Sequence, residues 1–233
     1  MNEQDRHKKQ AAEKAVEYIT DGMIVGLGTG STTAFAVRKI AQLIKENSLK
    51  KIRAIPSSKK TERLARRLQI PLTDFRKVLK IDVTIDGADE VDPHLNLIKG
   101  GGGALLREKI LIQASKRVII VVDGTKISKK LGTKCPVPIE VLPFAWELEA
   151  RYLKGLKAKP KLRRDARKKP YLTDQKNYIL DTDFGLIKDP EALNSKLNQH
   201  AGIIEHGLFV EMVTDIIVVG TKGNSHLKQY DLL

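Results

Sequence analysis

The feature that most constrains the fold of this chain is a repeated order of short apolar segment, polar turn and helix. Apolar segments of strand length alternate with stretches whose apolar residues recur at helical spacing. The strand-like segments are Met23–Leu27, 51–55, Ile81–Ile85 and Arg117–Val122, and the helical ones are 4–19, 35–44, Thr61–Leu68 and Ala104–Ser115. This alternation predicts an α/β fold with a mostly parallel sheet that helices cover on both faces.

Polar residues follow each of the four strand-like segments directly. They occupy positions 29–33, 56–58, 86–89 and 123–126. Because a parallel sheet binds ligands outside the carboxyl ends of its strands, we expect these four turns to contribute to one site.

The second half of the chain predicts a smaller α+β unit. Prolines flank a short strand at Ile139–Val141, and a helix carrying Trp146 follows it. A further strand and helix are expected at Tyr178–Asp181 and Pro190–Gln199, and strands at 207–212 and 216–220, the last returning to the main sheet. We therefore expect one domain from residues 1–132 with 207–233, and a second from 133–206.

The formal charge of +14 on 233 residues raises the question of nucleic-acid binding. The excess lies in two stretches, +7 over Lys50–Arg67 and +9 over Arg151–Lys169. Neither stretch has the interleaved aromatic residues of a base-stacking surface. We expect solvated basic surfaces that attract an anionic metabolite, and no nucleic-acid partner.

Membrane insertion and export are not expected from the sequence. No apolar run approaches the ~20 residues of a membrane helix, and the first ten residues lack the apolar core of a signal peptide. Cys135 is the single cysteine, which excludes an internal disulfide framework and fits the cytoplasm. Its position in a Lys-Cys-Pro segment favours an incidental thiol over a nucleophile.

The first polar turn, Gly28-Thr29-Gly30-Ser31-Thr32, joins a strand to a helix. It departs from a dinucleotide fingerprint at Ser31, and from a P-loop because Gly30 stands where lysine is required. Two interpretations stay open: a small-anion loop with hydroxyl donors at the helix N-terminus, or a helix cap made by one of the hydroxyls.

The stretch from Asp86 to Glu108 contains the largest number of candidate catalytic and binding residues in the chain. Asp86 and Asp89 follow a strand, Lys99 precedes four glycines, and Glu108 lies within two helical turns of them. Successive glycines let backbone N–H groups approach an anion, and carboxylates can move protons.

At these residues the sequence resembles type A ribose-5-phosphate isomerases over essentially its full length. The family motifs are matched in order by Gly28–Thr32, Asp86–Glu90, Lys99–Gly102, Arg107–Lys109, Asp123-x-x-Lys126, Pro138–Val141, Thr173-Asp174, Ile179–Asp181 and Gly207–Phe209. Gly103 departs from the family, which often has alanine there, and we expect it to loosen the loop slightly. The basic stretch near 161–169 also departs from the usual pattern.

The resemblance implies interconversion of D-ribose 5-phosphate and D-ribulose 5-phosphate through an enediolate, in the non-oxidative pentose phosphate pathway. It implies no metal and no organic cofactor. The implied fold is a Rossmann-like domain with a mostly parallel sheet plus a smaller α+β (ferredoxin-like) domain, and the implied assembly is a homodimer or homotetramer without membrane association.

The resemblance also assigns roles to residues. The implied catalytic residues are Glu108 for proton transfer, Asp86 and Asp89 for the sugar hydroxyls, and Lys99 for the oxyanion. The implied substrate-binding residues are Thr29, Gly30, Ser31, Thr32, Asp86, Gly87, Ala88, Asp89, Lys99, Gly100, Gly101, Gly102, Lys126 and Lys8, with Lys9 as the alternative to Lys8.

Two other functions compete with the isomerase. A sugar-phosphate sensor on the same fold could dispense with Glu108, and its presence in register argues against that class. A transferase with a covalent carboxylate would require an acyl or CoA partner.

Overall fold

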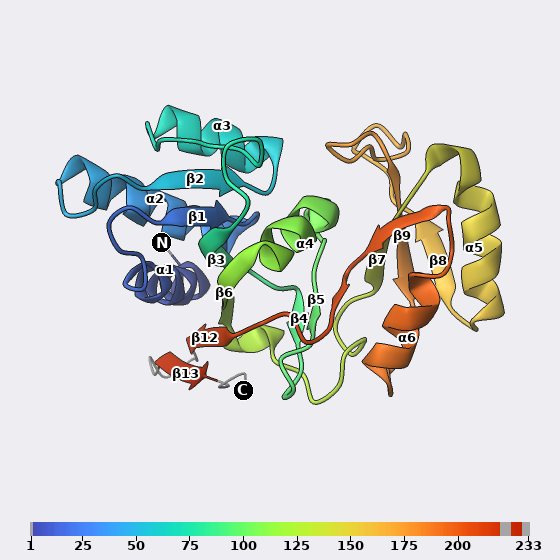
Figure 1. Cartoon of the computed structure of the whole chain (residues 1–233). Coiled ribbons are helices and arrows are strands. Elements are labelled where there is room, and N and C mark those ends of the chain that lie inside the picture. Colours follow the sequence, from blue (N-terminus) through green and yellow to red (C-terminus); the bar gives the residue numbers. More distant parts are fainter. Residues whose placement is uncertain (1, 220–224, 230–233) are drawn as a thin grey trace. The chain divides into compact units, whose positions relative to one another are not determined.

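The computed structural model of the chain describes residues 2–219 and 225–229 (Figure 1). The chain divides into two compact units. One consists of residues up to Gly87, Arg107–Thr125 and the residues from Met212 onward, and the other of Ala88–Leu106 and Lys126–Glu211.

A six-stranded sheet forms the centre of the first unit. Its strand order is β13-β12-β6-β3-β1-β2. All neighbouring strands are parallel except β13, which runs antiparallel to β12. The bounds are β1 Ile24–Leu27, β2 Arg53–Pro56, β3 Ile81–Asp86, β6 Ser115–Asp123, β12 Asp215–Val219 and β13 Ser225–Gln229.

Helices cover both faces of this sheet, because its central strands are apolar on both sides. On one face Val25 and Leu27 pack with Val37 and Ile40 of the helices, all fully buried. On the other face Ile24 joins a separate apolar cluster. The helices are α1 Glu3–Val16, α2 Ser31–Lys45, α3 Lys59–Arg67 and α4 Leu105–Gln113. Burying one such aliphatic side chain stabilises the fold by about 1.5–3 kcal/mol.

The register of the sheet brings the strand ends to one edge. Leu27 pairs with both Pro56 and Ile85, and Asp123 pairs with Val219. The turns that follow β1, β2, β3 and β6 therefore leave the sheet at the same edge, as the sequence predicts. The first two residues of the one-turn helix η1 (Gly124–Lys126) belong to this edge.

The second unit contains two antiparallel sheets. A four-stranded sheet has the order β10-β7-β9-β8, and a three-stranded one the order β11-β5-β4. Helices α5 and α6 pack their buried Leu153 and Leu197 in one core with Ile139 of β7. The bounds are β4 Glu90–Val91, β5 Leu97–Ile98, β7 Val137–Val141, η2 Pro143–Ala145, α5 Trp146–Gly155, β8 Lys159–Leu162, β9 Tyr178–Asp183, α6 Pro190–Leu197, β10 Ile203–His206 and β11 Leu208–Phe209.

The α/β fold class is confirmed, and several elements differ from their predicted bounds. The strand expected at 207–212 is the two-residue β11, which pairs with β5. The second unit also contains residues 88–106, 126–132 and 207–211, which the sequence assigns to the first domain. Strand β8 lies inside the basic stretch, where no strand is expected. The expected strand return to the main sheet is confirmed by β12 for residues 215–219; Gly220 lies outside the described residues.

Candidate active site

Asp86 is fixed at the end of β3 by the turn that follows β1. Its side chain is fully buried, and its Oδ1 accepts hydrogen bonds from the N–H of Gly87 at 2.8 Å and of Thr29 at 3.1 Å. Gly28 is required for this approach, because a Cβ at that position would lie 2.0 Å from Asp86 Oδ1. The glycine therefore sets the position of the carboxylate.

Thr29 belongs to a cluster of hydroxyl groups in the first unit. Its Oγ1 lies 2.7 Å from Ser57 Oγ, 2.8 Å from Ser58 Oγ and 3.3 Å from Thr61 Oγ1. The Thr61 hydroxyl in turn donates to Gly28 O at 2.9 Å. The side chain of Thr29 thus holds the turn in shape. Ser57, Ser58 and Thr61 were not assigned to the site from the sequence, although 56–58 was recognised as a polar strand end.

The N-terminus of α2 lacks a side-chain cap. Its N-cap residue is Gly30, with φ of 132°, and no side chain bonds the first N–H groups. Among the described residues, the hydroxyls of Ser31 and Thr32 take part in no hydrogen bond. The helix-cap interpretation of this turn is therefore wrong, and donors remain at the helix start for an anion.

Positive charge surrounds this turn. A cavity of about 550 Å³ opens between α2 and α3. Its lining is formed by the turn, apolar residues of both helices and four cations: Gly28, Gly30, Ser31, Ala34, Val37, Arg38, Lys60, Thr61, Arg63, Leu64 and Arg67. The basic stretch 50–67 thus contributes to an electropositive cavity beside Ser31, which favours an anionic ligand.

Lys8 is better placed than Lys9 for a role at the strand ends. Gln4, one turn earlier on α1, reaches Asp123 Oδ2 at the end of β6 with its Nε2 at 3.4 Å. Residues i and i+4 share a helix face, so Lys8 faces the same edge as Gln4. Its Nζ lies 3.8 Å from Asp5, whereas Lys9 is more exposed and lies 3.7 Å from Glu13. Lys126 follows Asp123 by one turn, at the end of η1.

Lys99 is a buried cation in the second unit. Only 2% of its surface is exposed, and its Nζ lies 5.6 Å from the centre of the Phe209 ring. The backbone is fixed by the bond from Lys99 N–H to Gly207 O at 2.9 Å. A lysine buried in this way is a compact donor for developing negative charge.

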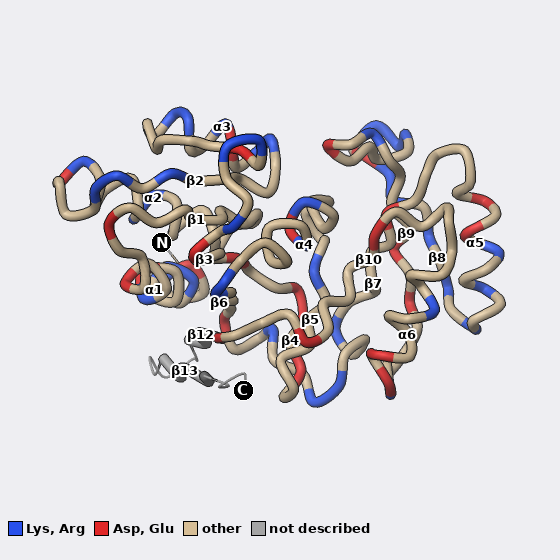
Figure 2. Tube along the Cα trace, in the orientation of Figure 1, with Lys and Arg blue, Asp and Glu red and all other residues tan. Residues whose placement is uncertain are grey.

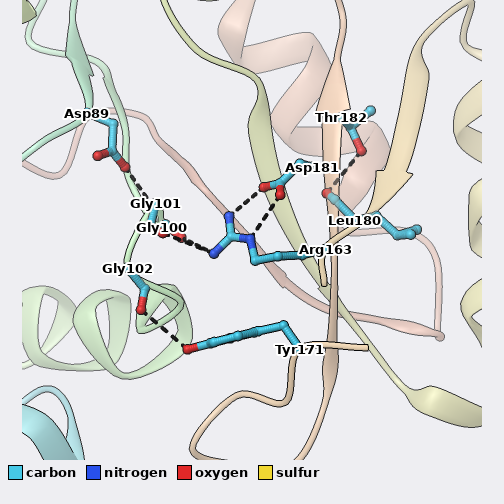
Figure 3. Close-up of polar contacts among 9 residues, drawn as sticks. All are labelled: Asp89, Gly100, Gly101, Gly102, Arg163, Tyr171, Leu180, Asp181 and Thr182. Carbon is cyan, nitrogen blue, oxygen red and sulfur yellow. Dashed lines mark hydrogen bonds and ion pairs between the residues drawn. The ribbon is translucent and has the colours of Figure 1, made fainter. Parts of the chain in front are cut away.

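The glycine run forms a tight turn against Asp89. Gly100 and Gly103 have positive φ, and the N–H of Gly103 donates to Gly100 O at 2.9 Å. Asp89 Oδ2 accepts from the N–H of Gly101 at 2.7 Å (Figure 3). In the described part of the chain, no hydrogen bond uses the N–H of Gly100 or Gly102.

Glu108 lies in the first turn of α4, and 3% of its surface is exposed. Helix α4 starts two residues after Gly103, so the glycine turn fixes where the helix begins. A buried carboxylate in this position is a group that can accept and return a proton.

The predicted residues divide between the two units. The first contains Lys8, Thr29–Thr32, Asp86, Gly87 and Glu108, and the second contains Ala88, Asp89, Lys99–Gly102 and Lys126. Arg163 and Tyr171, which bond the glycine run, were not predicted, because a basic stretch gives no signal for a single half-buried arginine.

Cys135 is unsuited to nucleophilic chemistry. Burial, and then the charge of Glu90, raises the pKa of its thiol to about 12. The thiol donates to Glu90 Oε2 at 3.6 Å, so it stays protonated at neutral pH. Within residues 2–219 and 225–229, no cluster of three or more His, Cys, Asp or Glu is arranged to hold a metal ion, and no helix there is long and apolar enough to span a membrane.

Comparison with known proteins identifies relatives over nearly the whole length. The family model described as ribose 5-phosphate isomerase A (phosphoriboisomerase A) matches residues 53–223. The ribose-5-phosphate isomerase A of Desulfatibacillum aliphaticivorans is 55% identical, covering 98% of this chain and 99% of the relative.

Solved structures give the same result. A D-ribose-5-phosphate isomerase in complex with phospho-erythronic acid is 39% identical with a TM-score of 0.95, covering 99% of this chain and 100% of that one. The ribose 5-phosphate isomerase of Plasmodium falciparum is 39% identical with a TM-score of 0.94, covering 97% and 99%.

Proposed function

This chain belongs to the ribose 5-phosphate isomerase A family, and from that premise we propose that it interconverts D-ribose 5-phosphate and D-ribulose 5-phosphate through an enediolate. The observation that carries the proposal is that Asp86, Lys99 and Glu108 are all buried. Burying three ionisable groups costs stability, and a role in proton transfer and charge stabilisation explains why the chain buries them.

Glu108 is the proposed base. It removes the proton from C2 of the open-chain aldose, and the electron pair moves to form the enediolate. The hydroxyl proton of O2 passes to O1, with Asp86 as the proposed carrier. The Glu108 carboxyl then returns its proton to C1, which leaves a carbonyl at C2 and yields the ketose.

The developing negative charge on O1 and O2 is assigned to Lys99 and the glycine run. The N–H groups of Gly100 and Gly102 are the proposed direct donors, while the N–H of Gly101 orients Asp89. A preorganised donor of this kind changes the rate by roughly 10²- to 10³-fold. Asp86 and Asp89, with the adjoining Gly87 and Ala88, are assigned to the sugar hydroxyls.

The phosphate is assigned to the uncapped start of α2. Ser31, Thr32 and the N–H groups after Gly30 supply donors, and Thr29 maintains the turn. Lys8 and Lys126 are the proposed cations. The cavity between α2 and α3 adds positive charge that attracts the dianion.

The test is a coupled assay for ribulose 5-phosphate formed from ribose 5-phosphate by the purified chain. We expect turnover that is unchanged after treatment with EDTA, since Lys99 and backbone amides act as the electrophile. Phospho-erythronic acid should compete with substrate, because it combines a phosphate with a planar carboxylate that resembles the enediolate. Absence of turnover, or its loss with EDTA, would refute the proposal.

We also propose a homo-oligomer in the cytoplasm. The oligomer is supported by Leu142, Phe144 and Leu148, which expose apolar side chains within seven residues around η2, Phe144 to 99%. Exposed apolar clusters of this kind favour an interface. The cytoplasm is supported by the protonated, unpaired thiol of Cys135.

A further inference from the structure

Arg163, at the end of β8, joins the glycine run to strand β9. Its Nε and Nη2 donate to the two carboxylate oxygens of Asp181 at 2.9 and 2.5 Å. Its Nη1 donates to the carbonyl oxygens of Gly100 and Gly101, each at 3.1 Å (Figure 3). The side chain is 15% exposed, whereas the other Lys and Arg residues of the stretch 151–169 are exposed. Figure 2 marks the Lys and Arg residues along this stretch in blue. One guanidinium thus spans two carbonyls and one carboxylate.

Tyr171 completes the contact from the same β8–β9 connection. Its hydroxyl donates to Gly102 O at 3.4 Å, and its N–H donates to Arg163 O at 2.9 Å. The Arg163 guanidinium lies 5.7 Å from the Tyr171 ring centre. Burial raises the pKa of the Tyr171 phenol, so its hydroxyl remains a donor at neutral pH.

The bonds from Arg163 and Tyr171 use the carbonyl oxygens of Gly100, Gly101 and Gly102. They leave the N–H groups at the other ends of these peptides for other partners. The carbonyl of Gly101 and the N–H of Gly102 belong to one peptide group, and the carbonyl of Gly100 shares its peptide with the N–H that Asp89 accepts. A cation on a carbonyl polarises the peptide and strengthens the donor at its other end. Arg163 therefore acts on the Gly102 donor and on the Asp89 position.

We propose that Arg163 and Tyr171 are positioning residues that hold and polarise the Gly100–Gly102 peptides for the oxyanion, with Asp181 orienting Arg163. This inference rests on the proposed function of the glycine run. Lysine cannot replace Arg163, because an ammonium lacks the planar fork that bonds Asp181 and both carbonyls together.

The experiment compares kinetics of Arg163→Met, Arg163→Lys and Tyr171→Phe with the wild type. The matched control is Arg164→Met, since Arg164 is exposed and adjacent, and its side chain bonds only Lys168 O within the described residues. We expect Arg163→Met and Arg163→Lys to lower kcat by about 10²-fold, the effect of one lost oxyanion donor, with KM for ribose 5-phosphate within about threefold. Tyr171→Phe should lower kcat by several-fold, and the control should match the wild type.

A second readout separates positioning from general stability. Binding of phospho-erythronic acid by calorimetry should weaken in Arg163→Met more than binding of inorganic phosphate, since only the former carries an enediolate-like carboxylate. Wild-type kcat in folded Arg163→Met, or full rescue by Arg163→Lys, would overturn the inference. If Arg163→Met does not fold, kcat and the binding of phospho-erythronic acid are measured for Asp181→Asn and Tyr171→Phe instead, and wild-type values in both would overturn the inference. Inactive wild type would instead refute the proposed function.

Discussion

At the scale of single residues, close approach explains where glycine is required. The side chain of Asp86 occupies the space where a Cβ of residue 28 would lie. An ideal Cβ built on Gly28 would be 2.1 Å from the Asp86 Cγ. The Asp86 carboxylate is fully buried, so it has little space to move away from a larger residue at position 28. This one contact links the phosphate turn to a residue assigned to the sugar hydroxyls.

Gly28→Ala should therefore displace Asp86 and break its bond from Thr29 N–H. We expect a loss of about 1–3 kcal/mol of stability, typical of overpacking, and at least a tenfold fall in kcat/KM. Urea unfolding and the coupled assay measure the two effects. Gly155→Ala is the matched control, because nothing lies within 4 Å of its ideal Cβ; a Gly28 variant as stable and active as this control would contradict the account.

Glu140 predicts a pH dependence of stability in the second unit. Burial raises the pKa of this carboxyl above 4.5, and the hydrogen bonds from Asn177 and Thr173 offset only part of that. The folded state therefore binds the proton more tightly than the unfolded state, so stability is full below pH 4.5 and falls as pH rises through the folded pKa.

Glu140→Gln removes this titration while keeping the side-chain oxygen that accepts from Thr173 and Asn177. The difference in unfolding free energy between the variant and the wild type should shift in favour of the variant as pH rises from 4.5 to 8. Urea unfolding across that range measures the difference. A difference independent of pH would show that Glu140 has its ordinary pKa in the folded chain.

At the scale of elements, the β8–β9 connection shows what sequence patterns could and could not predict. Strands β1, β3 and β6 are apolar and were found from the sequence. Strand β8 was missed because its residues alternate Lys, Pro, Lys and Leu within a basic stretch. The two-residue strands β4, β5 and β11 carry no periodicity of their own and depend on pairing between distant segments.

The site follows the same division. Motif residues such as Asp86 and Glu108 could be named from local sequence, and their burial agrees with a chemical role. Arg163 and Tyr171 could not be identified from local sequence, because the glycines that they bond lie some 60 to 70 positions earlier in the chain. Gly103 was expected to loosen the loop, whereas the ring of Tyr171 fills the space of its missing Cβ.

Gly103→Ala should clash with Tyr171, because the ideal Cβ lies 2.7 Å from Tyr171 Cε1, and the φ of 77° adds strain. We expect a loss of about 1–3 kcal/mol of stability. Gly103→Ala with Tyr171→Ala should lose less than the sum of the two single variants, since truncating the ring removes the clash. Thermal unfolding of the four proteins in the cycle tests this, and strictly additive effects would contradict it.

At the scale of the whole molecule, the two properties of interest are the distribution of the net charge and the assembly of several copies of the chain. The net charge of +14 is partly accounted for by the cavity between α2 and α3 and by Arg163, so both basic stretches contribute to the proposed chemistry. The exposed apolar side chains around η2 concern assembly instead.

Phe144→Asp should dissociate the proposed oligomer, because it places a charge in a surface that the second copy would cover. Light scattering coupled to size exclusion should give a mass near that of one 26.0 kDa chain for the variant and a multiple of it for the wild type. Leu186→Asp, which alters another exposed apolar residue, is the control. A monomeric wild type would contradict the proposal.

The central claim is that Glu108 moves the proton between C2 and C1, and exchange with solvent tests it most directly. Ribose 5-phosphate is incubated in D₂O with the wild type, Glu108→Gln and, as a matched first-turn control, Glu147→Gln of α5; deuterium incorporation into the sugar is followed by NMR. We predict incorporation with the wild type and Glu147→Gln, and none with Glu108→Gln although it still binds phospho-erythronic acid. Incorporation by Glu108→Gln at the wild-type rate would contradict the account.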